Sequence, residues 1–179
     1  MLASQTATKG WALLPLRLMI GFGFAAHGYA KLHRGPDKFA AILVSIGVPQ
    51  SHITAWVTAL LEFSGGISLM AGAFVLPLTV SLAVIMLTAL FTVHLRYGFS
   101  SLVLKGVTSA GAQFGPVGYE LNLLYIAALL TLAICGAGAL SVDEWLERSK
   151  SRSCTKCSSE IGVASQCPRD GITRSLLQS

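Results

Sequence analysis

Four long apolar segments dominate the pattern of hydrophobic and polar positions along this chain. They run over Trp11–Leu32, Ile53–Leu76, Leu78–Leu95 and Glu120–Leu140. Each is close to the ~20 residues that an α-helix needs to cross a ~30 Å hydrocarbon core. Ionisable residues interrupt the segments, and such side chains face the interior of a bundle rather than lipid. The pattern therefore predicts an all-α fold, an integral membrane four-helix bundle with a polar interior.

The connections between these segments predict how the helices are arranged. Phe39–Ile46 is apolar but too short to span, so we expect it to lie along the membrane interface. Pro77 stands between the second and third segments, which predicts a tight turn and an antiparallel hairpin. The connection from Phe99 to Gly118 is long for a compact bundle, which makes it a candidate functional loop or lid.

Composition supports a membrane protein. The mean hydropathy is +0.66, and 12% of residues are charged, against about 25% in an ordinary soluble domain. The net charge of +5 is carried by loops and the tail, where Lys and Arg flank membrane spans, so we expect no nucleic-acid partner. A cleaved signal peptide is the alternative to a retained first helix. Arg17 lies inside the apolar stretch, which is also too long for a signal, so we favour a retained helix.

The chain divides into three parts: residues 1–10 form a polar segment, residues 11–145 the membrane domain, and residues 146–179 a disordered tail. The tail is rich in Ser, Lys and Arg, and it follows a short amphipathic stretch, Val142–Arg148. It contains Cys154, Cys157 and Cys167, but no fourth zinc ligand and no folded thioredoxin-like unit around the C-x-x-C pair. We predict no metal site, and the role of these cysteines stays open.

Orientation follows weakly from charge. Five basic residues flank the membrane on the side of the termini and five on the other side, so the positive-inside rule does not decide between them. Arg17 lies near the terminal side and favours a multi-pass protein with both termini in the cytoplasm.

The first two segments hold polar residues on defined faces. At 100° per residue, a narrow arc of the first helix contains Arg17, Gly21, Phe24, Gly28 and Lys31, and His27 lies beside it. Glu62 lies about midway along the second segment. A carboxylate at that depth costs several kcal/mol unless it is paired or neutral, so Glu62 should face the bundle.

Several of these residues should converge, because neighbouring helices run in opposite directions. The set that lies toward the face opposite the termini is His27, Lys31, Glu62, His94, Glu120 and Asn122. We predict that His27 and Glu62 exchange protons and that Arg17, Lys31, His94 and Glu120 bind a cofactor. The alternatives are that Arg17, Lys31 and His94 extend to the interface, and that Glu62 is a structural partner of Arg17 or Lys31.

The same residues carry a resemblance to a known family. The motifs are Arg17-Leu18 with Gly21 and Phe24, His27-Gly28-Tyr29-Ala30-Lys31-Leu32, Leu61-Glu62 with Gly65-Gly66 and Gly72, Tyr119-Glu120-Leu121, and Gly136-Ala137-Gly138-Ala139-Leu140-Ser141-Val142-Asp143. Over about residues 12–145 the chain resembles the DoxX family, although that family often has Pro at the position of Ala137 and a basic residue at that of Ala139. The resemblance implies a four-helix protein of the bacterial cytoplasmic membrane.

The resemblance also implies a link to redox processes, since the family takes its name from a subunit of a thiosulfate:quinone oxidoreductase. Three functions follow as hypotheses. The first is a membrane subunit of a quinone- or thiol-linked redox or oxidative-stress system, with quinone as a possible cofactor and redox or oxidative-stress enzymes as possible partners. The second is a non-catalytic scaffold. The third is a small transporter, which would need a homodimer to form a path.

Overall fold

The computed structural model describes residues 2–109 and 111–149 of the chain. In chain order the elements are α1 (Leu2–Arg34), α2 (Pro36–Ser45), α3 (Ser51–Ala71), α4 (Val75–Ala89), the π-helical turn η1 (Leu90–His94), the 3-10 turn η2 (Leu95–Tyr97), β1 (Leu104–Thr108), β2 (Gly111–Phe114) and α5 (Glu120–Cys135). Residues 142–149 form one more helical segment. The described chain is thus mostly helical, as predicted.

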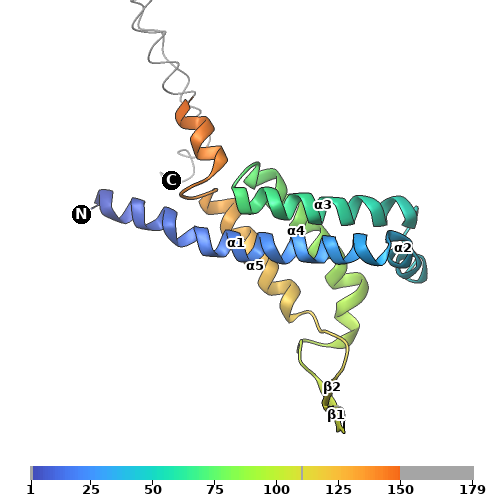
Figure 1. The fold of residues 1–179 in the computed structure, drawn as a ribbon. Helices are drawn as coiled ribbons and strands as arrows, with labels where there is room; N and C mark the ends of the chain where they lie inside the picture. The colour runs from blue at the N-terminus through green and yellow to red at the C-terminus, as the bar shows by residue number, and fades with distance from the viewer. Residues whose placement is uncertain (1, 110, 150–179) are drawn as a thin grey trace, which may run out of the picture.

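The helices form two pairs (Figure 1). Helices α1 and α3 lie side by side and share the largest interface, and α4 pairs with α5. The second pair runs across the first at a steep angle, and α2 packs against the start of α3. The predicted antiparallel hairpin of the second and third segments is not formed, because α4 turns away from α3 after their connection. The regular four-helix bundle that we expected is therefore not confirmed.

Glycines allow the close approach of α1 and α3. A Cβ atom on Gly21 would lie 2.7 Å from the carbonyl oxygen of Gly66, and one on Gly28 would collide with the backbone of Phe63. Such small residues let two helix backbones touch. The arc predicted on α1 is the face that is used here, because Arg17, Gly21, Phe24 and Gly28 are all buried.

Two helical stretches, Ser51–Ala71 and Val75–Tyr97, are long and apolar enough to cross a membrane. Only 33% and 22% of their apolar windows are buried inside the protein, whereas a core helix of a soluble protein would be mostly buried. Large apolar side chains are also exposed on other helices, among them Met19, Phe22, Leu124 and Leu130. Exposure of this extent fits a protein that contacts lipid.

The outer two predicted spans differ from expectation. Helix α1 begins at Leu2, inside the segment that we predicted to be a polar extension, and it is not among the membrane-capable stretches. Helix α5 ends at Cys135 and has 16 residues, about 24 Å, which is short of a ~30 Å core. It ends there because Gly136 has a φ of 81°, a conformation that stops a helix.

The break between α3 and α4 occurs earlier than Pro77. Gly72 ends α3 in the left-handed conformation, with a φ of 72°, and Phe74 precedes α4 with a φ of 54°. Pro77 lies in the first turn of α4, where a missing N–H costs no helical hydrogen bond. The proline thus lies within the next helix, and Gly72 rather than Pro77 makes the turn.

The long connection folds into a β-hairpin that the sequence did not predict. Strands β1 and β2 are antiparallel, and a bulge interrupts the register between Leu104 and Gly106. Because the bulge adds one residue, the pairs Leu104–Phe114 and Val107–Ala112 fall on the same face of the ribbon. The hairpin therefore presents an apolar face on one side and Gly106 with Gln113 on the other.

Beyond α5, residues 142–149 are helical, which agrees with the amphipathic stretch predicted at Val142–Arg148 and extends into the part assigned to the tail. Cys154, Cys157 and Cys167 lie outside the described residues.

Candidate functional site

A cavity of about 710 Å³ lies where the two helix pairs meet. Its walls are mostly apolar and come from α1, α2, α3, α4 and α5. Four of the six predicted site residues line it, namely His27, Lys31, Glu62 and His94. A volume of this size is within the range that small-molecule sites occupy.

An ion pair between α1 and α3 forms one side of the cavity. The Nζ atom of Lys31 lies 2.6 Å from both Oε1 and Oε2 of Glu62. The Glu62 side chain is 2% exposed and that of Lys31 is 23% exposed, so the carboxylate is buried and the ammonium is partly accessible. The sequence left open whether Arg17 or Lys31 pairs with Glu62, and the partner is Lys31.

The same ammonium group also contacts α2. It lies 4.6 Å from the centre of the Phe39 ring, a cation–π distance. The short helix that was expected at the membrane interface therefore supplies one wall of the cavity, through Phe39, Ile42 and Leu43.

His94 approaches from the other helix pair. It is the last residue of the π-helical turn η1, and turns of this kind are frequent at functional sites. Its Nδ1 atom lies 2.9 Å from the carbonyl oxygen of Val117, and Val117 also lines the cavity. The connection that we considered as a functional loop therefore holds a site residue in position.

Helix α5 adds Asn122, which we expected at this face without giving it a role, and Tyr125, which we did not predict. Asn122, which is 7% exposed, donates from Nδ2 to the Met86 carbonyl oxygen at 3.2 Å, and Tyr125 lies one turn further along the helix. The Tyr125 ring packs edge-to-face on Phe24, with 5.2 Å between ring centres. The spacing of three residues that places Asn122 and Tyr125 on one face was the available signal.

His27 lines the cavity from α1 and is exposed. Its ring centre lies 6.5 Å from that of Tyr125, also in an edge-to-face arrangement. It is one turn before Lys31, so the histidine and the ion pair face the same space.

The other two predicted residues lie outside the cavity. Glu120 accepts a hydrogen bond from the backbone N–H of Ser101 at 3.0 Å, which fixes the start of α5. Arg17 is 14 residues before Lys31, about 21 Å along α1. Arg17 is 1% exposed, and its guanidinium donates to the carbonyl oxygens of Ala137 and Leu140.

Arg17 belongs to a junction at the opposite end of the protein, formed by α1, the α3–α4 turn and residues 136–143. The Asp143 carboxylate accepts hydrogen bonds from the backbone N–H groups of Phe74 and Val75, at 2.9 and 3.0 Å, and so caps the start of α4. The N–H of Asp143 donates in turn to the carbonyl oxygen of Gly72 at 3.1 Å. The glycine-rich motif of the sequence is therefore a structural connection.

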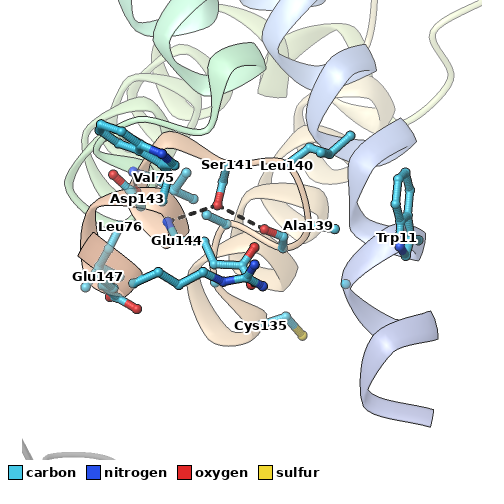
Figure 2. Close-up of a pocket in the computed structure, with 16 residues that line it drawn as sticks. Trp11, Val75, Leu76, Cys135, Ala139, Leu140, Ser141, Asp143, Glu144 and Glu147 are labelled. Atoms are coloured by element: carbon cyan, nitrogen blue, oxygen red, sulfur yellow. Dashed lines mark hydrogen bonds and ion pairs between the residues drawn. The ribbon is translucent and has the colours of Figure 1, made fainter. Parts of the chain in front are cut away.

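A second cavity, of about 780 Å³, adjoins this junction. Figure 2 shows Ser141, Asp143 and Glu144 gathered beside the start of α4, with Trp11 and Cys135 on other parts of the wall. Ser141 Oγ donates to the Gly138 carbonyl oxygen and accepts from the Glu144 N–H. These hydrogen bonds hold the connection between α5 and the last helical segment beside the start of α4.

Comparison with known proteins assigns a family to the part of the chain that supplies most of the first cavity's wall. Residues 12–95 match the family model of DoxX. The chain carries a domain of the DoxX family. This DoxX domain includes His27, Lys31, Glu62 and His94, and it ends before α5, so the match is shorter than the 12–145 over which motifs resemble the family. No curated protein and no solved structure matches the chain significantly.

Metal binding was not predicted for this DoxX protein. Among residues 2–109 and 111–149, no group of three or more His, Cys, Asp or Glu side chains is placed to hold a metal ion.

Proposed function

We propose that this DoxX protein is a membrane subunit of a redox or oxidative-stress system and that it binds a quinone-class molecule in the cavity between its helix pairs. The observation that supports this is the Lys31–Glu62 pair, which places a buried carboxylate and a partly accessible ammonium beside a cavity of mostly apolar walls. A quinone has the matching chemistry, since its ring and tail are apolar and its oxygens accept hydrogen bonds.

In this proposal each residue has a defined task. Lys31 donates to a ring oxygen of the ligand, because an ammonium has three N–H groups and can serve Glu62 and the ligand together. Glu62 and His27 take up or release protons as the ligand changes protonation state. Phe24 and Tyr125 provide aromatic surface for the ring.

The setting of the protein is also part of the proposal. We place it in the bacterial cytoplasmic membrane as a multi-pass protein with both termini in the cytoplasm, where a lipid-soluble ligand reaches the cavity from the bilayer. A partner oxidoreductase or oxidative-stress enzyme exchanges electrons with the ligand.

The test is a quinone-binding titration of the protein purified in mild detergent. Wild type should bind saturably, and Glu62→Gln and His27→Ala should each lower affinity by about tenfold, the usual effect of losing a hydrogen bond to a charged group. Glu144→Gln is the matched control, because Glu144 pairs with Arg148 on the exposed surface, away from the cavity. Absence of binding by wild type would refute the proposal.

A non-catalytic scaffold is the second candidate, and one observation favours it. Both oxygens of Glu62 lie within hydrogen-bond distance of Lys31 Nζ, so the pair is complete without a ligand and ties α1 to α3. If the protein is a scaffold, neither wild type nor Glu62→Gln should bind quinone. Partner proteins should still co-purify with the variant.

A further inference from the structure

The hydrogen-bond roles around the first cavity indicate which form of ligand it takes. His94 Nδ1 lies 2.9 Å from the Val117 carbonyl oxygen. A carbonyl oxygen can only accept, so Nδ1 must carry the hydrogen. In the neutral imidazole the other nitrogen, Nε2, is then an acceptor, and no described residue bonds to it.

Asn122 is fixed in a similar way. Its Nδ2 group donates to the Met86 carbonyl oxygen at 3.2 Å, which orients the amide and leaves Oδ1 as an acceptor at the cavity wall. The turn η1 and helix α5 therefore each present an acceptor to the cavity. The Tyr125 hydroxyl can donate or accept, so it does not favour either kind of ligand.

The Lys31 ammonium is largely engaged and has one N–H group left for a ligand oxygen. Lys31 Nζ is held by both oxygens of Glu62 and by the Phe39 ring. The pair is neutral as a whole, so it favours a neutral ligand over an ion. The opposite wall presents acceptors on His94 and Asn122, so it favours a ligand that donates hydrogen bonds.

We infer that the cavity takes a neutral hydroxylated aromatic molecule, a phenol or hydroquinone, whose O–H donates to Nε2 of His94. The inference rests on the proposed function and narrows it, because it selects the reduced, hydroxyl-bearing form over the quinone. Asn122 Oδ1 accepts from the same hydroxyl or from a second one. His94 is then a specificity-determining residue, and Val117 positions it.

The experiment compares three ligands of nearly equal size on wild type in detergent: a hydroquinone, the corresponding quinone and the di-O-methyl ether of the hydroquinone. The hydroquinone should bind about tenfold more tightly than the ether, which retains the ring and oxygens but has no donor. It should also bind more tightly than the quinone.

Two variants of His94 assign the effect to one nitrogen. His94→Asn keeps an N–H near the Nδ1 position, where it can still donate to Val117, but it removes Nε2. We expect it to lower hydroquinone affinity to that of the ether and to leave binding of the ether unchanged. His94→Gln can place an amide oxygen near Nε2, and we expect it to restore part of the preference.

The outcomes separate the inference from the proposed function. Equal affinity for all three ligands in wild type, with affinity still lowered about tenfold in Glu62→Gln, would overturn the inference and leave the proposed function intact. Binding of none of the three would refute both. The wild-type comparison requires no variant to fold, so a poorly folded His94→Asn would not prevent a decision.

Discussion

Neighbouring glycines on α3 should respond in opposite directions to the same substitution. A Cβ atom on Gly66 would collide with the backbone nitrogen of Ala25 and would lie 2.5 Å from the carbonyl oxygen of Gly21. A Cβ atom on Gly65 would lie 3.4 Å from Leu78 Cδ2, which is ordinary contact. Both changes to Ala gain about 1 kcal/mol of helix propensity, so this gain cancels in a comparison.

The magnitude follows from what has to move. At Gly66 the obstacles are backbone atoms of α1, which cannot rotate away, so α1 and α3 must separate and lose packing along their shared interface. Overpacking of this kind costs about 1–3 kcal/mol. We therefore expect Gly66→Ala to lower the free energy of unfolding by up to about 2 kcal/mol, and Gly65→Ala to raise it by up to about 1 kcal/mol.

The assay is reversible unfolding of purified protein in mixed micelles, followed by far-UV circular dichroism as the denaturing detergent increases. The two variants should differ by about 1–3 kcal/mol, with Gly66→Ala the less stable. Stabilities that agree within about 0.5 kcal/mol, or the reverse order, would show that α1 and α3 are not in backbone contact at this position.

Three further predictions address other parts of the protein. Asp143→Asn should lower unfolding stability by about 1 kcal/mol through loss of the charged cap on α4, and Glu147→Gln on the same terminal helix should change it by less than about 0.5 kcal/mol; a thermal melt in detergent compares them. Lys31→Met should lower the free energy of unfolding by about 3 kcal/mol, because it leaves the Glu62 carboxylate buried without a partner. Adding Glu62→Gln to this variant should recover much of the lost stability. Additive effects in this double-mutant cycle would contradict a direct pair. Gly118→Ala should weaken the preference for hydroquinone over its ether, because a Cβ atom there would meet carbonyl oxygens of the preceding loop and displace the backbone that holds His94. Gly106→Ala is the control, because a Cβ atom at Gly106 meets open space and should leave that preference unchanged.

Local patterns in the sequence identified the buried face of α1 and the need for a partner at Glu62. Both follow from simple rules, since a helix repeats every 3.6 residues and a buried carboxylate requires compensation. The convergence of His27, Lys31, Glu62 and His94 also followed, because it needs only alternating helix directions. The buried face, the need for a partner and the convergence would be the same in several different packings of the helices, so the sequence predicts them without predicting the packing.

The features that the sequence did not predict depend on backbone groups far along the chain. Arg17 donates to carbonyl oxygens more than 100 residues away, and every residue type has a carbonyl oxygen, so no side-chain pattern marks the partner. The divergence of α3 and α4 follows from left-handed conformations at Gly72 and Phe74, and Phe74 is not a residue that favours such a conformation. The hairpin depends on a bulge that reverses the expected alternation of its side chains.

Arg17 and Lys31 lie on the same face of α1, and their partners give them different functions. Carbonyl oxygens accept the hydrogen bonds of Arg17, and these groups neither gain nor lose protons at ordinary pH. Lys31 meets a carboxylate beside a cavity, where a ligand or a proton can alter the pair. Substitutions at the Arg17–Asp143 end should therefore change stability and leave ligand preference intact. Substitutions at His94 should change ligand preference with little effect on stability, and a variant that violates this division would show that the two ends are coupled.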